Sequence, residues 1–591
     1  MTQMCNNSLL TAAVVWKLED LYTSPEDPHI GEHVRQCRER ATALMRRYAG
    51  RVADLDAAAL AGLIADLEAL NTLVTRLSTY AFLNFITRID DAAASALHQQ
   101  MEELAAEIGR LTVFFRLEWN HLPGDKARQL VATTALQRYA HYLEALRRYA
   151  PYQLGQQREE LLQELAPVGR SAWNVLFDKV MGQLRFGEEQ RSEEEVLSDL
   201  YHRERSVRIE AAQQLTQGLR NNLHILTHIF NTLAAEKMIE DRVRGYPHWS
   251  AVMNLENELA DTTVETLVEV VTSRYDLVHR YYRLKRRLLG LDELFDYDRY
   301  APVPGLESTA LSWPACREIV QDAFTRFSPE MARISAMFFD NGWIHAPVLP
   351  AKRGGAFAHP CVPDVHPYVM VNYTGNLRDV ATVAHELGHG VHQYLAAPQG
   401  LYNADTPLVL AETASVFAEL LVFRAQLELL DSDAQRRAFT CQKLESIFAT
   451  VFRQVAMNRF EARLHNGRRE EGELSGARLS SFWLETQQPM FGDAVTLTEG
   501  YGLWWSYIPH FLATPGYVYS YAFGELLVLA LYARYLDEGD DFVARYLDLL
   551  AAGGSKAPGD LLLPFAINLN DPEFWQGGLT IIEGMLEDVG A

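Results

Sequence analysis

Apolar residues recur at steps of three and four along most of this 591-residue chain, and this periodicity constrains its fold most strongly. The clearest stripe runs through Leu60, Leu63, Ile64, Leu67, Leu70, Val74, Leu77 and Ala81. Similar spacing covers residues 97–117 and 130–154, continues from 192 to 339, and dominates again after 376. Such a stripe gives each helix one face for a packed core. The sequence therefore predicts a mainly α-helical fold.

One segment interrupts this pattern. Prolines 347, 350, 360, 363 and 367 surround the pair Gly354-Gly355, and prolines at this density exclude a helix. Residues 368–373, Tyr-Val-Met-Val-Asn-Tyr, then predict a short strand. Asn376, with Asp379 three residues later, resembles a capping box that opens a new helix. A small β element is thus expected directly before that helix.

A charged stretch containing glycine, residues 186–191, is typical of a linker. We therefore expect a helical N-terminal domain over residues 1–190 and a second domain over residues 191–591.

Composition excludes several classes of protein. The 54 basic and 77 acidic side chains give a net charge of −23, which argues against a nucleic-acid partner. The five cysteines contain no Cys-x-x-Cys pair, so neither a disulfide framework nor a thiolate zinc site is indicated. The N-terminus lacks the basic flank of a signal peptide, and no segment approaches the ~20 apolar residues of a membrane span. We expect a cytoplasmic protein without a membrane partner.

The most specific chemical signal is the sequence His385-Glu386-Leu387-Gly388-His389. Two imidazoles four residues apart lie one turn apart on the same helix face, as two ligands of one tetrahedral zinc ion must. Glu386 lies about 100° round the helix, from where it could act as a base on water at the metal. His392 shares the histidine face, and the opposite face is apolar, formed by Val380, Val383, Leu387, Val391 and Tyr394. Ordinary solvated histidines are the alternative interpretation.

A catalytic zinc site needs a third protein ligand. Residues 410–419 form a strongly apolar segment that carries Glu412 and Glu419 seven positions apart, on one helix face with Ser415 beside them. Carboxylates in an apolar helix are costly unless they are paired or bind a metal. We expect Glu412 to be the third ligand and Glu419 an outer partner that orients a ligating group. Salt bridges to arginines elsewhere are the alternative for both.

These residues resemble the thimet oligopeptidase family of zinc peptidases, and most of all its oligoendopeptidase F branch. The resemblance rests on residues 385–392 followed by Glu412-Thr413-Ala414-Ser415 and Glu419, and on the segments 352–357, 367–373, 508–511, 517–521 and 553–555. It is dense from residue 192 to the end and weaker before it, where residues 16–22 still fit.

The resemblance implies a closed helical ellipsoid of the gluzincin type, with one Zn²⁺ per chain in an internal channel that the N-terminal domain covers. Substrates would be short unstructured peptides cut at internal bonds. In the family the third ligand matches Glu412, and a histidine and tyrosines from the region of residues 510–521 stabilise the oxyanion. His510, Tyr517 and Tyr521 are our predictions for these groups, and the choice among Tyr517, Tyr519 and Tyr521 stays open.

Substrate contacts are expected along the predicted strand and the glycine loop before it. An extended peptide could pair with a free edge of the strand that carries Tyr368 and Met370, and Tyr519 is a further expected contact. Gly354 and Gly355 would let the loop backbone approach the substrate closely. His392 is a motif member without a ligand role, expected in the outer layer of the site. For Lys352 and Arg353, a substrate carboxylate and solvent are equally good partners.

Two alternatives remain open from the sequence. A zinc carboxypeptidase or dipeptidyl carboxypeptidase of related fold would use the same ligands but trim peptide ends. A non-catalytic helical scaffold would use the metal only for stability, although such a site has no need of Glu386. Zinc is preferred over Mn²⁺ or Co²⁺ only because two imidazoles and a carboxylate suit it.

Overall fold

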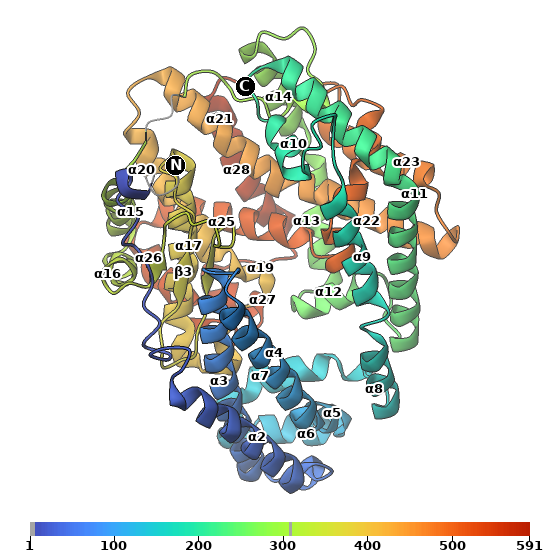
Figure 1. The fold of residues 1–591 in the computed structure, drawn as a ribbon, viewed down its shortest axis with the longest axis vertical. Coiled ribbons are helices and arrows are strands. Elements are labelled where there is room, and N and C mark those ends of the chain that lie inside the picture. Colours follow the sequence, from blue (N-terminus) through green and yellow to red (C-terminus); the bar gives the residue numbers. More distant parts are fainter. Residues whose placement is uncertain (1–5, 307–309) are drawn as a thin grey trace. The chain divides into compact units, whose positions relative to one another are not determined.

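The computed structural model describes residues 6–306 and 310–591, and helices make up most of it (Figure 1). The chain forms two compact units, each assembled from three separate stretches of sequence. Unit 1 contains the described residues of Met1–Pro151, Ser308–Leu429 and Arg534–Ile567, and unit 2 those of Tyr152–Glu307, Leu430–Ala533 and Asn568–Ala591. The predicted mainly helical class is confirmed. The predicted division at residue 190 stays a prediction.

Unit 1 begins with a group of antiparallel helices and ends with the elements that carry the histidine motif. The first group is α2 (Pro28–Tyr48), α3 (Ala57–Ile86), α4 (Ala92–Thr112), α5 (Phe114–His121), α6 (Gly124–Val131) and α7 (Ala140–Arg148). The second is α15 (Trp313–Phe327), α16 (Pro329–Asp340), α17 (Leu377–Ala396), α18 (Leu401–Ala404), α19 (Leu408–Ala411), α20 (Thr413–Glu428), α26 (Asp540–Ala552) and α27 (Pro558–Leu562).

Helix α3 is long and apolar enough, by length and composition alone, to cross a membrane, contrary to the sequence expectation that no segment approaches this length. In unit 1 it packs against α2 and α4 (Figure 1). The stripe predicted from its spacing is its buried face, since Leu60, Leu63, Ile64 and Leu70 are all 0% exposed. This is the burial of a core helix.

The predicted β element is a three-stranded sheet in unit 1. Strands β1 (Ile344–His345), β2 (Phe357–His359) and β3 (Tyr368–Met370) lie in the order β1-β3-β2. β3 is parallel to β1 and antiparallel to β2, with Ala358 opposite Val369. The strand predicted over 368–373 is thus confirmed for its first three residues. The predicted capping box is also present, because the Asn376 side chain accepts from the Asp379 amide at 2.9 Å and opens α17.

The regular elements of the described part of unit 2 are helices, and two isolated bridges join Phe186 to Arg191 and Phe295 to Thr496. The first bridge closes the predicted linker into a turn. Its earlier helices are α8 (Gln156–Leu165), α9 (Arg170–Gln183), α10 (Glu193–Asp199), α11 (Arg205–Arg244), α12 (Ala251–Glu256), α13 (Asp261–Ser273) and α14 (Asp276–Leu288). Its later helices are α21 (Asp433–Thr450), α22 (Phe452–Glu470), α23 (Gly476–Phe491), α24 (His510–Ala513), α25 (Tyr519–Glu538), whose last turns belong to unit 1, and α28 (Pro572–Asp588).

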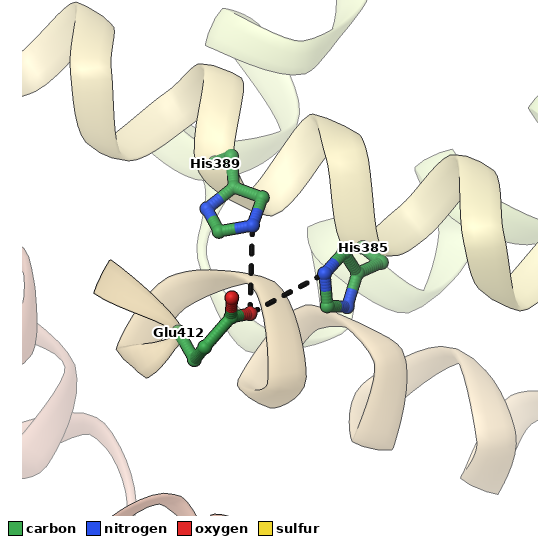
Figure 2. A group of neighbouring side chains, drawn as sticks. All are labelled: His385, His389 and Glu412. Atoms are coloured by element: carbon green, nitrogen blue, oxygen red, sulfur yellow. Dashed lines mark ion pairs between the residues drawn. The ribbon is translucent and has the colours of Figure 1, made fainter. Parts of the chain in front are cut away.

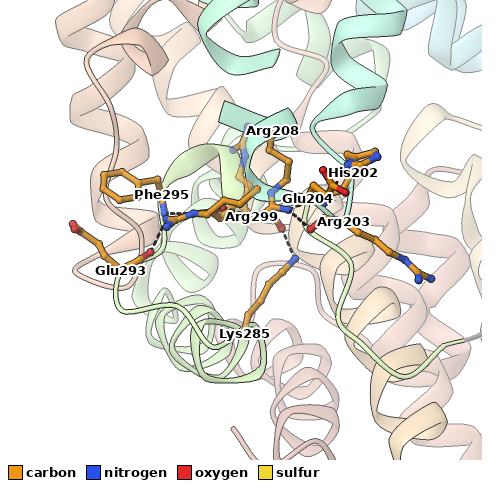
Figure 3. Close-up of polar contacts among 10 residues, drawn as sticks. His202, Arg203, Glu204, Arg208, Lys285, Glu293, Phe295 and Arg299 are labelled. Atoms are coloured by element: carbon orange, nitrogen blue, oxygen red, sulfur yellow. Dashed lines mark hydrogen bonds and ion pairs between the residues drawn. The ribbon is translucent and has the colours of Figure 1, made fainter. Parts of the chain in front are cut away.

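A buried polar network holds the segment after α14 in place. Asp298, which is 0% exposed, accepts from Arg205 at 2.7 Å and from Arg208 at 2.8 Å. Lys285 on α14 extends its ammonium group to the backbone carbonyl of Arg299 at 2.6 Å (Figure 3). Because a buried charge without partners is costly, these contacts fix the path of residues 295–300.

Candidate metal centre

Helix α17 presents its two motif histidines on one face and packs its apolar face into the core. Val380, Val383, Leu387 and Val391 are at most 1% exposed, as the predicted pattern requires. The rings of His385 and His389 lie one turn apart with their centroids separated by 4.9 Å. The two faces of the helix are therefore divided between core packing and chemistry.

Glu412 reaches this histidine face from the break between α19 and α20, where it is the residue that caps α20. The two helices α17 and α20 approach closely because Gly388 lies between the histidines. A Cβ atom at Gly388 would lie 2.5 Å from the carbonyl oxygen of Ala414 and 2.7 Å from the Cα of Ser415. Only glycine leaves room for this packing.

Three donor atoms converge in the resulting space (Figure 2). Glu412 Oε2 lies 3.3 Å from His385 Nε2 and 3.5 Å from His389 Nε2. Ligands about 2.0–2.1 Å from a tetrahedral zinc ion are separated from one another by about 3.3–3.4 Å. All three side chains are partly exposed: 26% for His385, 19% for His389 and 32% for Glu412. Donor chemistry, spacing and access thus fit a divalent cation with an open coordination position.

A second layer of contacts orients these donors. Glu419 Oε2 lies 3.4 Å from Nδ1 of His385, the ring nitrogen that faces away from Glu412. Ser415 Oγ donates to Glu412 Oε2 at 2.7 Å. Such outer contacts fix the tautomer of a ligating histidine and the direction of a carboxylate. Glu412 and Glu419 each face the motif histidines.

The charges of this group suit a cation. Burial by itself would lower the pKa of His385, but its hydrogen bond to Glu419 and the charge of Glu412 outweigh that effect and raise the pKa to about 9. Burial raises the pKa of Glu412, whereas the hydrogen bond and charge of His389 prevail and lower it to about 2. A metal ion bound here would displace the proton that the raised pKa favours on His385.

Glu386, the predicted base, is 6% exposed and lies beside β2. Burial raises the pKa of its carboxyl group, while the two motif histidines and the backbone N–H of Ala358 act in the opposite direction. The carbonyl of Ala358 accepts from Gln393 on α17 at 3.4 Å. Both backbone polar groups of Ala358 are therefore directed at the zinc-motif helix.

The structure corrects the predicted substrate strand. β3 is the central strand of the sheet, so neither of its edges is free, and β1 and β2 form the two edges instead. Tyr368 and Met370 are 0% exposed and belong to the core that the N-terminal helices build. Their predicted contact with substrate is wrong because no surface of either side chain is accessible.

The glycine loop is exposed, as a substrate contact requires. Gly354 and Gly355 are both exposed, and Gly355 has a φ of +82°, which favours glycine. A cavity of about 340 Å³ begins at Gly355 and extends to Thr382 on α17; it is lined by Gly355, Ala356, Val371, Asn372, Tyr373, Asp379 and Thr382. Lys352 takes neither of the predicted partners, since its ammonium group is buried and donates to the carbonyls of His345, Pro347 and Val371.

The predicted oxyanion residues form a cluster of their own in unit 2. Tyr521 OH lies 3.4 Å from His510 Nε2, and the Tyr517 and Tyr521 ring centroids are 4.9 Å apart. All three side chains are half-buried. Tyr519 is different, because it is 0% exposed and its hydroxyl accepts from Asn257 at 2.9 Å, so its predicted contact with substrate is wrong. In unit 1 His392 is 6% exposed, and burial and the charge of His389 lower its pKa to about 3.

Sequence reasoning missed Gly388, Ala358 and Gln393 as contributors to the site. Gly388 stands inside the motif, but its role follows from the approach of α20, which no local pattern reveals. Ala358 carries no side-chain chemistry, so only its backbone could have indicated a role.

Comparisons with known proteins place the chain in a family. The model of Peptidase family M3 matches residues 199–581, and a second model, Oligopeptidase F, matches residues 118–186. Oligopeptidase PepF of Bacillus subtilis is 26% identical over 99% of this chain and 88% of its own. Group B oligopeptidase PepB of Streptococcus agalactiae is 24% identical over 77% of this chain and 76% of its own.

Solved structures share the fold. A structure from Chlamydophila abortus superimposes with a TM-score of 0.84 at 23% identity, covering 98% of both chains. Oligoendopeptidase-F from Enterococcus faecium gives a TM-score of 0.70 at 21% identity, covering 95% of this chain and 96% of its own. Because the family model covers well over half of the sequence and includes every residue of the metal centre, this chain belongs to peptidase family M3.

Proposed function

We propose that the protein is a zinc-dependent endopeptidase that hydrolyses internal bonds of short, unstructured peptides. The observation that carries this proposal is the convergence of His385, His389 and Glu412 on one point, with distances of 3.3 and 3.5 Å between donors. A zinc ion bound there would supply Lewis acidity, which lowers the pKa of water and polarises the scissile carbonyl.

Glu386 supplies the proton transfers in this proposal. It takes a proton from the attacking water and delivers it to the departing amine, which requires a carboxylate that is ionised at rest but basic enough to hold a proton briefly. Its burial raises its pKa in the required direction, and the backbone N–H of Ala358 holds its carboxylate beside β2.

We further propose that the substrate backbone binds along β2. Ala358 already uses its edge groups on α17, so Ala356, two residues earlier, presents its backbone groups along the same edge. Backbone pairing is indifferent to side chains, which suits an enzyme for varied peptides. The cavity at Gly355 would receive one substrate side chain.

His510, Tyr517 and Tyr521 would donate to the oxyanion of the tetrahedral intermediate. The proposal is supported by their partial exposure and by the contact between Tyr521 and His510. The proposal also includes the domain division and the location of the protein. In it, residues 191–591 are the catalytic domain, residues 1–190 are a domain that restricts access of substrates to the active site, and the protein is cytoplasmic.

Glu386→Gln tests the mechanism. The variant should bind one zinc ion per chain, because Glu386 is not among the three donors, yet lose at least 10²–10⁴-fold in kcat on a quenched-fluorescence peptide. Unchanged turnover would contradict the mechanism, and loss of zinc would move Glu386 into the ligand set.

A peptide blocked at both termini separates the endopeptidase from the carboxypeptidase alternatives, which need a free carboxylate. We expect internal cleavage detected by mass spectrometry. Resistance of the blocked peptide with cleavage of the free one would favour the end-trimming enzymes.

A further inference from the structure

A second polar site lies within unit 2, and its lining includes neither the proposed metal ligands nor the predicted oxyanion residues. It is a small cavity of about 40 Å³ where α14, α21, α22 and α23 meet the segment after residue 298. One water molecule needs about 10–15 Å³ on this measure, so the space holds a very small ligand. Its lining residues are Val278, Tyr282, Arg299, Tyr300, Glu445, Phe448, Ala449, Phe452, Arg453, Met490 and Phe491.

Two arginines line this cavity without a full set of partners. Arg299 is 3% exposed and donates from Nη1 to the Tyr501 hydroxyl at 3.0 Å, while its Nε and Nη2 have no hydrogen-bond partner. Arg453 donates from Nη1 to the Tyr300 hydroxyl at 3.1 Å, and its Nε has none. Buried guanidinium donors left unpaired are costly, which points to an acceptor that belongs in the cavity.

No carboxylate of the described chain neutralises this pair within ion-pair distance. Glu445, which lines the cavity, is already engaged by the Lys285 ammonium group and the Tyr281 hydroxyl. Asp296 is the other buried acid that acts on Arg299; its Oδ1 accepts from the Thr498 amide at 2.7 Å, its Oδ2 has no hydrogen-bond partner, and it forms no ion pair with either arginine. Arg299 and Arg453 line the same cavity, and their like charges repel each other.

Aromatic rings surround the Arg299 guanidinium on several sides. Its Cζ lies 4.5 Å from the Tyr300 ring centroid, 4.9 Å from that of Tyr501 and 5.7 Å from that of Trp504. The rings stabilise the cation through their faces and keep water away, which strengthens any charge pair formed inside. The backbone of Arg299 is held by Lys285, so the guanidinium is presented from a fixed position (Figure 3).

We propose that this cavity binds one small monovalent anion of the size of chloride, held by Arg299 and Arg453. A space of about 40 Å³ suits a small inorganic anion better than a phosphate or carboxylate that carries an organic chain. The anion would link the segment after residue 298 to α22 and so stabilise unit 2.

Thermal unfolding of the full chain tests the proposal. Chloride should raise the apparent Tm by about 2–4 °C, and saturate, when it replaces gluconate at constant ionic strength and temperature ramp. Bromide should act in the same way, since it differs little in size. If chloride and gluconate give equal Tm values, the arginines are balanced within the chain, by Tyr300 or Asp296, and the proposal fails.

Arg453→Gln should lose the chloride increment, because it removes one of the two cations. Arg459→Gln is the matched control, since Arg459 is exposed on the same helix, and it should keep the full increment. Should Arg453→Gln not fold, bromide-soaked crystals of the unsubstituted protein decide the matter. An anomalous peak between Arg299 and Arg453 supports the site, and its absence at saturating bromide overturns it.

Discussion

At the scale of single residues, the metal centre depends on two carboxylates with different tasks. Glu412 places one oxygen 3.3 and 3.5 Å from the two imidazoles, whereas Glu419 approaches the other nitrogen of His385 at 3.4 Å. The first can share an ion with both histidines, and the second can only orient one of them. Substitutions of the two residues should therefore change the affinity for zinc to different extents.

Glu412→Ala should abolish tight zinc binding, because two imidazoles alone leave the site a ligand short. Glu419→Gln should weaken zinc binding by about 10–100-fold and leave the stoichiometry at one, as outer-layer substitutions do. Competition with a chromophoric chelator measures both. Equal losses in the two variants would contradict the assigned division of roles.

At the scale of elements, the site exists because α17 and α20 pack in direct contact at Gly388. This close packing brings Glu412 to the histidine face, although Glu412 lies 22 positions after Gly390 in the sequence. Any side chain at residue 388 must push the two helices apart.

Gly388→Ala should therefore destabilise the protein by about 1–3 kcal/mol through overpacking and weaken zinc binding at least tenfold. Gly62→Ala is the control, since Gly62 is a helical glycine in α3 whose Cβ would meet nothing within 4 Å. The control should be neutral or slightly stabilising, by up to about 1 kcal/mol. Unfolding calorimetry with a zinc titration measures both effects, and full zinc affinity in Gly388→Ala would refute the packing argument.

Another element-scale link ties α22 to the loop before Tyr517. Glu461 on α22 is 0% exposed and accepts from the Gly516 amide at 2.8 Å. Burial raises the pKa of Glu461 from 4.5 to about 8, so the folded protein keeps a proton that the unfolded chain loses. The stability due to the neutral acid is present below pH 4.5 and is lost as pH rises through 8.

Glu461→Gln, which resembles the neutral acid, should accordingly gain stability relative to the unsubstituted protein between pH 5 and 8, by at most about 1.4 kcal/mol per pH unit. Glu470→Gln, at the exposed end of the same helix, should show no such trend. The measurement is the apparent Tm of each variant and of the unsubstituted protein across this pH range. A constant difference between Glu461→Gln and the unsubstituted protein would show that Glu461 does not change its protonation.

At the scale of the whole molecule, both units have apolar cores that do not involve the metal centre. The core of unit 1 joins the N-terminal helices to Tyr368 and Met370, and unit 2 buries residues such as Trp483, Trp504 and Trp505. Burial of this kind supplies most of the stability of a folded chain. Metal should thus be required for chemistry far more than for folding.

Removal of zinc with a chelator should abolish peptide hydrolysis while the far-ultraviolet circular dichroism stays unchanged. The apparent Tm should fall by no more than a few degrees, and one equivalent of Zn²⁺ should restore activity. Collapse of helicity on chelation would instead support the alternative in which the metal has a structural role.

The sequence by itself determined the helical class, the capped start of α17, the two histidines and the acid that follows them, because these depend on spacing along one helix or on short motifs. It also sufficed to identify the family. Tertiary structure alone decided that β3 is the central strand of the sheet, that Tyr519 is buried against Asn257, and that Lys352 binds backbone carbonyls. It alone brought Arg299 and Arg453 to one cavity. The physical reason is that strand order, burial and contacts between distant residues depend on which segments of the chain pack together. The periodicity of apolar residues along the chain does not specify those pairings.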